Sequence, residues 1–558
     1  MESYSDAIVS LASLRRGSTN VPVRVLLIGP YDPHGGEYTF LAPPLGVWRL
    51  AGVLQQHEIA AHVFDPNCCS ESPESVLSEL LTQHRWDVIG ISTTGMTLRY
   101  DLALAHLAKR LQPEACLIAG GMEATFEPEV MLGLAPFDLV VLGEGEEPLL
   151  EIAKRLGARA GLENIRGTVR RDADGGVRRL SAAALGPSQL RDSIFAIPYE
   201  RMPYPEYWER LEKSYQLGKL PNKADREARL AEIRSVRLIT LNYCPMGCTF
   251  CSSTNFLNAA QGSTAKIARL DAADCVSMVE RIVAAQPGVR TVIFQDDIFV
   301  FRNDDRILPL CEAIVEAKHR GRIPRDLQFI STNRLDAMTP GNLAAMRRAG
   351  FRVLGFGIES FSLGMLREFN KAQIHPFIEP ILRNALSLGI TPFLDMILSS
   401  PRCELVDIAE NVRQAFTWTV AGCEVGMYPY VIPFSGAAMA SDPALRASTI
   451  STTRYVAGSR VRWKQAVKIL PLNPAAREVI LQIEHAYEEW LGRFTEVVPH
   501  LPSRVRSLLW ILSAVPVFER RGCRVPPQEA VAQALVQRVP GTAARTVVTS
   551  MVMAEQTA

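Results

Sequence analysis

Three cysteines in the middle of the chain have a spacing suited to binding iron. Cys244, Cys248 and Cys251 form a C-x3-C-x2-C pattern. Thiolates are the usual protein ligands of iron–sulfur clusters, and a short loop can place three of them around one cuboidal cluster. Three ligands leave one iron with an open coordination position, where a small molecule can bind. The two alternatives are a structural zinc site, which requires a fourth Cys or His nearby, and unconnected buried cysteines.

The composition is that of an ordinary globular protein without a strong net charge. The chain has 558 residues, of which 47% are hydrophobic and 21% charged, and its 60 basic residues nearly balance its 59 acidic ones. The length predicts several domains, and the balance argues against nucleic acid and membranes as partners. We find no signal peptide and no apolar run long enough to span a membrane. Eleven scattered cysteines favour reduced thiols, so we expect a cytoplasmic protein with a small-molecule or peptide substrate.

Short apolar runs alternate with helical patterns between residues 22 and 156. Continuous apolar strands separated by helices are typical of a parallel sheet covered on both faces. We therefore predict an α/β, Rossmann-like domain, with any ligand at the carboxyl ends of its strands. The loop after the first run, GPYDPHGG, lacks the G-x-G-x-x-G pattern of an NAD-binding domain. The runs occupy residues 23–30, 59–66, 87–93, 115–121 and 139–145.

A second series of strands and helices follows, and the three cysteines come directly after its first strand. Six units are too few for an eight-stranded barrel, so we predict a partial (βα)6 barrel at 236–440 with its site at the carboxyl ends of the strands. Residues 1–21 are predicted as a tail, 157–235 as a linker and 441–558 as a helical C-terminal domain, with one helix beginning at Pro474 behind Asn473. The predicted barrel strands occupy 237–243, 291–297, 326–333, 352–360, 390–399 and 424–432.

The segment YCPMGCTFC resembles the signature of the radical S-adenosylmethionine (SAM) enzymes. In that family three cysteines hold a [4Fe–4S] cluster, and the open iron binds the amino and carboxylate groups of SAM. The resemblance implies that Cys244, Cys248 and Cys251 are the cluster ligands and that Phe250 belongs to the cofactor site. It also implies reductive cleavage of SAM to a 5′-deoxyadenosyl radical. The resemblance covers the whole predicted barrel.

The same resemblance implies that residues at the ends of the barrel strands bind SAM. Carboxylates suit the ammonium and ribose hydroxyls of SAM, and a guanidinium suits its carboxylate. Each residue also has an alternative role, as a strand-end cap or in a surface ion pair. The loop after the fifth strand, MILSSPRCE, departs from the family's glycine-rich pattern, so no contact is assigned there. The expected SAM contacts are Asp296, Asp297, Ser331, Arg334 and Glu359.

A Rossmann-like domain before such a barrel resembles the cobalamin (B12)-binding subclass of this family. The resemblance rests on LLIGPYDP, on APPLGVWRLAGVL and on the loops STTGM, GGMEAT and GEGEEP, which would approach the corrin and its nucleotide tail. His34 lies in DPHGGE, a near match to a histidine-ligand motif. It is either the lower cobalt ligand or a turn residue, and we favour the turn. The implied cobalamin contacts are Ser92, Thr93, Thr94, Gly120, Gly121, Gly143, Glu144 and Gly145.

With both cofactors, the resemblance implies a methyltransferase. A methyl group would pass from SAM through methylcobalamin to a substrate radical made by the 5′-deoxyadenosyl radical, with electrons from an external reductant such as flavodoxin or ferredoxin. The alternatives are a cobalamin-dependent cyclase or ring-rearranging enzyme without methyl transfer, a radical SAM enzyme with an empty N-terminal domain, and an inactive corrinoid-binding protein. Tyr428 and Tyr430 on the last predicted strand are expected either to face the site or to pack in the core.

Overall fold

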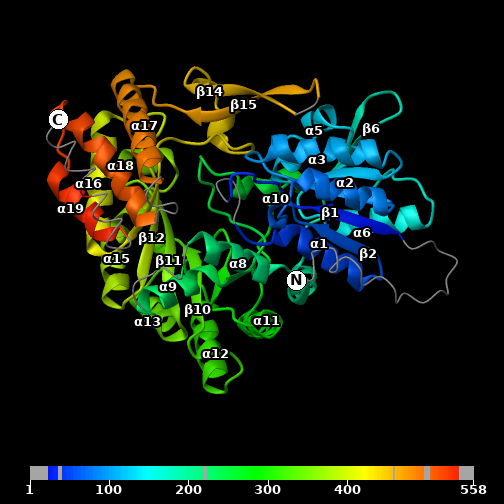
Figure 1. The fold of residues 1–558 in the computed structure, drawn as a ribbon, viewed down its shortest axis with the longest axis horizontal. Helices are drawn as coiled ribbons and strands as arrows, with labels where there is room; N and C mark the ends of the chain where they lie inside the picture. The colour runs from blue at the N-terminus through cyan, green and yellow to red at the C-terminus, as the bar shows by residue number, and fades with distance from the viewer. Residues whose placement is uncertain are drawn as a thin grey trace. The chain divides into compact units, whose positions relative to one another are not determined.

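The chain forms two compact units (Figure 1). The first comprises Met1–Pro203, Asn255–Ala268 and Thr453–Lys464, and the second comprises Tyr204–Thr254, Arg269–Thr452 and Gln465–Ala558. The computed structural model describes residues 23–35, 41–215, 217, 223–456, 459–495, 503–539 and 549. The predicted tail at 1–21 lies outside the described residues.

The first unit is built on a seven-stranded sheet. Its first five strands are parallel in the order β2-β1-β3-β4-β5, which is a doubly wound arrangement, so the predicted fold of this domain is confirmed. The last two strands add an antiparallel edge within the segment predicted as a linker, and the exposure of β7 explains why no apolar run marked it. The strands are β1 (Arg24–Ile28), β2 (Ala60–Phe64), β3 (Val88–Thr93), β4 (Cys116–Gly121), β5 (Leu139–Val141), β6 (Thr168–Arg171) and β7 (Val177–Leu180).

Helices connect these parallel strands and bury the strands' apolar side chains. Leu26 on β1, Ile89 on β3 and Leu117 on β4 are all fully buried in one core cluster with residues of the connecting helices. The helices are α1 (Leu45–Gln56), α2 (Pro73–Gln83), α3 (Leu98–Leu111), α4 (Met122–Phe126), α5 (Pro128–Leu134), α6 (Glu146–Gly157) and α7 (Pro187–Phe195). Part of α10 (Ser253–Gln261) also belongs to this unit.

The second unit contains a six-stranded parallel sheet whose strands are in sequence order. This order is that of the predicted partial barrel, and Figure 1 shows β10, β11 and β12 side by side. Its strands are β8 (Ser235–Leu238), β9 (Thr291–Phe294), β10 (Gln328–Asn333), β11 (Phe351–Glu359), β12 (Thr391–Ile397) and β13 (Glu424–Tyr428). Its helices up to β13 are α8 (Tyr204–Ser214), α9 (Lys223–Ile233), α11 (Ala272–Ala285), α12 (Ile307–His319), α13 (Pro340–Ala349), α14 (Leu363–Glu368), α15 (Ile378–Ser387) and α16 (Leu405–Ala421).

The C-terminal segment is helical after a short two-stranded sheet that the sequence analysis did not predict. β14 (Thr449–Tyr455) and β15 (Arg462–Ile469) pair with each other, and most of their residues are only partly buried, so they lack the apolar runs of the other strands. The helices are α17 (Pro474–Thr495), α18 (Ser503–Glu519) and α19 (Gln528–Arg538). The predicted start of α17 is confirmed, because Asn473 Oδ1 accepts hydrogen bonds from the backbone N–H groups of Ala475 and Ala476. Among the described residues, no helix combines the length and the hydropathy needed to cross a bilayer.

Two glycines of α1 provide a test of the packing in the first unit. A Cβ atom on Gly52 would lie 2.0 Å from the backbone oxygen of Ala196, whereas a Cβ on Gly46 would meet nothing within 4 Å. We expect Gly52→Ala to lower the free energy of unfolding by roughly 1–3 kcal/mol or more, because the contact is with backbone. Gly46→Ala should leave it unchanged or raise it by up to about 1 kcal/mol. Urea unfolding of the two variants checks this, and equal stabilities would contradict it.

Candidate functional site

The three cysteines lie in a loop after β8, in the second unit. Cys244 is buried, Cys248 and Cys251 are partly buried, and each acts electrostatically on its neighbours. Burial raises the pKa of Cys244 to about 12, and burial also raises the pKa of Cys248. The Cys244 and Cys248 thiols therefore keep their protons when no metal is bound, and a metal must displace these protons to bind. Within the described part of the chain, no three His, Cys, Asp or Glu side chains surround one point closely enough to bind a single metal ion.

The loop brings three cysteines together. They are close enough to one another to interact electrostatically. A structural zinc needs four ligands, whereas a cuboidal cluster with one open iron needs three. The number of cysteines in the loop is therefore the number that such a cluster requires.

Segments far along the chain hold the cysteine loop in place. Asn370 Nδ2 donates to the backbone oxygen of Gly247 at 3.0 Å, and the Thr249 hydroxyl donates to the backbone oxygen of Glu368 at 2.7 Å. Phe250 packs edge-on against Phe369, with 5.1 Å between ring centroids. The residues that follow α14 thus fix the loop, and Phe250 contributes packing.

A buried ion pair lies beside the loop. Lys371 Nζ lies 2.9 Å from Glu359 Oε1 and also donates to the backbone oxygen of Gly357. Burial alone would lower the pKa of Lys371, but Glu359 outweighs it and raises that pKa. The Lys371 cation also acts on Cys248, and it opposes the effect of burial on the pKa of that thiol. Lys371 therefore places positive charge near the cysteines, which favours thiolates.

Arg334 carries a buried donor without a partner. Its Nε and Nη2 atoms bind both oxygens of Asp336 at 2.8 and 3.1 Å. Its Nη1 atom is buried and makes no hydrogen bond to the described residues. The guanidinium also acts electrostatically on Cys248. An unpaired buried donor is costly, so this atom is suited to an anionic group of a ligand.

Asp395 carries a carboxylate without a partner. On β12, Leu394 and Met396 are fully buried, whereas Phe393 and Asp395 are partly exposed on the opposite face of the strand. Among the described residues, none forms a hydrogen bond or an ion pair with the Asp395 carboxylate. Burial raises the pKa of Asp395 to about 7, Glu359 adds to this shift and Lys371 opposes it. The sequence analysis missed Asp395, because it lies inside a strand and matches no motif.

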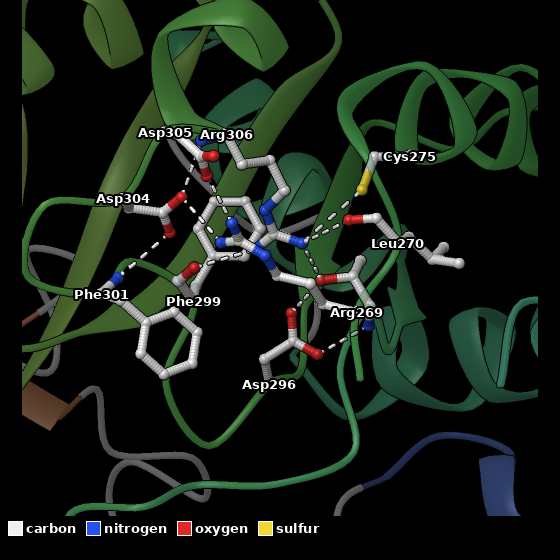
Figure 2. Close-up of polar contacts among 10 residues, drawn as sticks. Arg269, Leu270, Cys275, Asp296, Phe299, Phe301, Asp304, Asp305 and Arg306 are labelled. Atoms are coloured by element: carbon white, nitrogen blue, oxygen red, sulfur yellow. Dashed lines mark hydrogen bonds and ion pairs between the residues drawn. The ribbon is translucent and has the colours of Figure 1, made fainter. Parts of the chain in front are cut away.

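Asp296 binds the backbone just before the cysteine loop. Its carboxylate accepts hydrogen bonds from the backbone N–H groups of Thr240 and Leu241 and from the Thr240 hydroxyl. Arg306, which the sequence analysis missed, donates to the same hydroxyl and to the backbone oxygens of Leu270 and Phe299 (Figure 2). Burial raises the pKa of Asp296 to about 6. These contacts occupy Asp296 within the protein, so its placement favours the alternative role as a structural residue.

Asp297 and Ser331, both expected SAM contacts, lie in different environments. Asp297 hydrogen-bonds to Ser253 and acts electrostatically on Cys244, so it belongs to the surroundings of the cysteine loop. Ser331 is buried on β10 and is hydrogen-bonded to Asn333. The next residue, Thr332, is exposed, and it faces Gly355 on β11. Thr332 therefore shares the face of the sheet that carries Asp395, and Ser331 lies on the other face.

In the first unit, some of the expected cobalamin contacts are partly exposed, and the others are engaged in contacts within the protein. Ser92 and Gly120 are neighbours in register at the carboxyl ends of β3 and β4, both are partly exposed, and a Cβ on Gly120 would meet nothing within 4 Å. This edge has room for a ligand at backbone level. Gly121 has φ +97°, and a Cβ there would lie 2.5 Å from the backbone oxygen of Thr93, so glycine is required.

The remaining expected contacts are used within the first unit. The Thr93 hydroxyl donates to Gly120 O and is fully buried, and the Thr94 hydroxyl is 2.8 Å from that of Thr97. Glu144 pairs with Arg49 at 3.6 Å. A Cβ on Gly143 would lie 2.7 Å from Ala260, and one on Gly145 would touch Leu50, so these two glycines allow close packing. Ser92, Gly120 and Gly121 therefore have the placement that suits a cofactor best.

His34 is exposed and held by local contacts. Its backbone N–H donates to Asp32 Oδ1 at 2.9 Å, and its ring Nε2 lies 2.9 Å from the Tyr100 hydroxyl. Asp32 is buried and is itself tied to Asn67. These contacts are those of a turn residue, which is the reading that the sequence favoured.

The comparisons with known proteins agree with this arrangement. Residues 33–153 match the family described as the B12 binding domain. A similar solved structure is that of TsrM from Kitasatospora setae, a radical S-adenosylmethionine methyltransferase with cobalamin and a [4Fe–4S] cluster bound. The two chains superpose with a TM-score of 0.62 at 13% sequence identity, and the match covers 96% of this chain and 100% of TsrM. The chain has the fold of a cobalamin-dependent radical SAM enzyme. The predicted fold class and family resemblance are therefore confirmed, and this radical SAM fold places the cysteine loop at the carboxyl end of β8.

Three relatives share sequence similarity with much of this chain. An uncharacterized methyltransferase from Pyrococcus horikoshii is 25% identical over 64% of the chain and 70% of its own length. Cytidylyl-2-hydroxyethylphosphonate methyltransferase from Streptomyces wedmorensis is 27% identical over 62% of the chain and 67% of its own length. An anaerobic magnesium-protoporphyrin IX monomethyl ester cyclase from Cereibacter sphaeroides is 23% identical over 71% of the chain and 60% of its own length.

The ion pair beside the loop gives a stability prediction. Lys371→Met leaves the buried Glu359 carboxylate without its cation, so we expect a loss of about 3–5 kcal/mol in the free energy of unfolding. The double variant Lys371→Met, Glu359→Leu removes both charges and should recover most of that loss. Urea unfolding of the metal-free protein measures both. A double variant as unstable as the single one would contradict this account.

Asp395 gives a pH prediction. Its folded-state pKa of about 7 lies above the ordinary value of 3.8, so the folded state binds this proton more tightly than the unfolded state does. Its contribution to stability is therefore complete below about pH 4 and is lost as the pH rises through 7. Asp395→Asn should be increasingly stabilised relative to wild type between pH 4 and 8. A stability difference that does not change with pH over this range would refute the assignment.

Proposed function

We propose that this protein is a cobalamin-dependent radical SAM methyltransferase, which moves a methyl group from SAM through cobalamin to a substrate radical generated by the 5′-deoxyadenosyl radical. The observation that carries the proposal is a B12-binding domain in the same chain as a three-cysteine loop beside an unpaired arginine donor. The similarity to two methyltransferases supports the choice of reaction.

In the second unit, the chain's own residues have separate roles in this proposal. Cys244, Cys248 and Cys251 hold the cluster, which when bound supplies the electron that cleaves SAM. Arg334 offers its free Nη1 to the SAM carboxylate, a charge-assisted hydrogen bond that fixes the orientation of SAM. Lys371 favours the thiolate forms of the ligands, and Glu359 keeps Lys371 in place.

In the first unit, the edge formed by the ends of β3 and β4 holds cobalamin, which when bound supplies a methyl carrier. Ser92 offers a hydroxyl, and Gly120 and Gly121 allow a close backbone approach. Thr93, Thr94, Gly143, Glu144 and Gly145 shape this edge through the contacts described above. The proposal assigns no cobalt ligand to His34.

The partners follow from the same chemistry. A small-molecule substrate is proposed, and an external reductant such as flavodoxin or ferredoxin would have to supply two electrons per turnover, one for the cluster and one to return cobalamin to its reduced form. We propose no nucleic-acid or membrane partner, because the net charge is only +1. A cytoplasmic location is part of the proposal, since no disulfide bond joins the described cysteines.

A second candidate is a cobalamin-dependent cyclase or ring-rearranging enzyme that transfers no methyl group. The similarity to the magnesium-protoporphyrin ester cyclase favours it. The two reactions leave different products from SAM. Methylation consumes two SAM molecules and leaves S-adenosylhomocysteine together with 5′-deoxyadenosine.

The cysteine ligands give the first functional prediction. Replacing Cys244, Cys248 or Cys251 singly by alanine should remove most of the iron and abolish 5′-deoxyadenosine formation, because each thiolate holds one iron. Cys523→Ser is the matched control, since Cys523 is a partly exposed cysteine outside the loop. Iron and sulfide analysis of anaerobically reconstituted protein, with chromatography of the products from SAM and dithionite, measures this. Zinc at the loop in iron-free medium with normal product formation would refute the proposal.

The second functional prediction concerns the products of turnover. Protein reconstituted with cluster and cobalamin should form S-adenosylhomocysteine and 5′-deoxyadenosine in about equal amounts once its substrate is present, and the product should gain the mass of one methyl group. Mass spectrometry with methyl-labelled SAM follows the label. Sustained 5′-deoxyadenosine formation without S-adenosylhomocysteine would favour the cyclase reading.

A further inference from the structure

The carboxylate of Asp395 stands between two glycines. In the register of the sheet, Asp395 on β12 pairs with Gly357 on β11 and with Gly426 on β13. Residues paired in register point to the same face, so neither glycine places a side chain of its own beside Asp395. On the Gly357 side, Glu359 and Lys371 occupy the space, because a Cβ on Gly357 would lie 2.5 Å from Glu359 Oε1 and 3.0 Å from Lys371 Nζ. A Cβ on Gly426 would lie 3.4 Å from Asp395 Oδ1, so the carboxylate extends toward Gly426, and its partly exposed position makes it accessible to a ligand group.

The charges around Asp395 are already paired with each other. Lys371 is held by Glu359 at 2.9 Å and by the backbone oxygen of Gly357, and Arg334 is held by Asp336. Glu359 raises the pKa of Asp395 more than Lys371 lowers it, so the paired lysine does not neutralise the Asp395 carboxylate. A cationic group is the ligand that a carboxylate without a partner attracts.

Two aromatic side chains lie on the same face. Phe393 is two residues before Asp395 on β12, and its ring would come within 3.3 Å of a Cβ on Gly426. Tyr428 is two residues after Gly426 on β13 and is 53% exposed. Burial raises the pKa of Tyr428, and Asp395 and Glu359 raise it further, so its ring lies near both carboxylates. A carboxylate beside aromatic rings is a combination that binds organic ammonium groups.

We propose that Asp395, with Phe393 and Tyr428, forms a substrate subsite that binds a protonated amine carried by the substrate. The proposal rests on the proposed function, because it takes this face of the barrel as the place where the substrate binds. It assigns Asp395 to substrate specificity and leaves SAM to the cysteine loop and Arg334. It also gives Tyr428 a role at the site, whereas Tyr430 is tied to Glu484 at 2.7 Å.

The test measures binding of a simple ammonium ion to the protein reconstituted with cluster, cobalamin and SAM. The probe is 2-phenylethylammonium at pH 8, and 2-phenylethanol is the neutral control of similar shape. Saturation-transfer NMR gives the two dissociation constants. We expect the ammonium to bind at least tenfold more tightly than the alcohol, and Asp395→Asn to weaken the ammonium roughly tenfold or more while leaving the alcohol unchanged.

Two further variants separate the carboxylate's charge from its surroundings. Gly426→Ala keeps the charge but fills the space beside it, so it should weaken both probes. Glu312→Gln removes one exposed carboxylate on α12 and should change neither constant. Thermal unfolding of each variant identifies loss of fold. If the Asp395→Asn protein unfolds, the dissociation constants of the two probes are compared between the Gly426→Ala protein and wild type. This comparison then decides the proposal.

The outcomes distinguish this inference from the function on which it rests. SAM cleavage to 5′-deoxyadenosine with dithionite is measured for the Asp395→Asn protein and for wild type. If the variant binds cluster normally but loses SAM cleavage, or if wild type binds the ammonium probe only when SAM is absent, then Asp395 belongs to the SAM site and the inference is overturned. Equal binding of ammonium and alcohol by wild type also overturns it. If wild-type protein with a full cluster cleaves no SAM, the proposed function fails instead.

Discussion

The irregular loop that carries Cys244, Cys248 and Cys251 depends on hydrogen bonds and packing from outside itself. A loop of this kind cannot satisfy its own backbone groups as a helix or strand does. Gly247 and Thr249 obtain partners from Asn370 and Glu368, which lie more than a hundred residues further along the chain. The orientation of the three thiols is thus set by the barrel around them, and the motif alone does not determine it.

The charges beside the cysteine loop come from the same segment that holds the loop. Lys371 follows Asn370, whose side chain binds the backbone of Gly247. Lys371 is buried with Glu359 and places a positive charge near Cys248. Buried charges are costly unless paired, and Arg334 Nη1 and the Asp395 carboxylate both lack a hydrogen-bond partner among the described residues, so these two groups are suited to binding ligands. One unpaired group is a donor and the other an acceptor. They therefore suit ligand groups of opposite charge.

Much of the fold was predictable from the sequence, and the parts that were missed share a cause. The parallel strands appear as continuous apolar runs because both of their faces are buried. β7 and most of β14 lie at the surface and have no such run. The cysteine triplet could be recognised because its spacing is local, and its role as a set of cluster ligands stays a prediction. Lys371 was not, since it reaches Glu359 through the turn of the chain after α14, and no pattern marks that approach.

The choice between Ser331 and Thr332 shows a second limit. Both are small hydroxyl residues near the end of the third barrel strand, and only the period-two alternation of β10 decides which one shares a face of the sheet with Asp395. A shift of one residue in the position of the strand reverses that choice, and the ends of strands predicted from sequence are uncertain by more than one residue. Asp296 likewise looks like a cofactor ligand at a strand end until its carboxylate is seen to be occupied by Thr240 and Leu241.

The relatives include both methyltransferases and a cyclase, so the fold and the cysteine loop do not by themselves fix the reaction. In the proposed function, the cysteines and the residues that hold them serve SAM cleavage, whichever reaction follows. What happens to the substrate depends on how the barrel face binds it, because geometry decides which bond a radical meets. The row Gly357, Asp395 and Gly426 lies on that face, and Lys371 links Gly357 to the residues beside the loop. Differences in outcome among proteins of this fold should therefore arise from such rows, while the cysteine loop and its contacts stay unchanged.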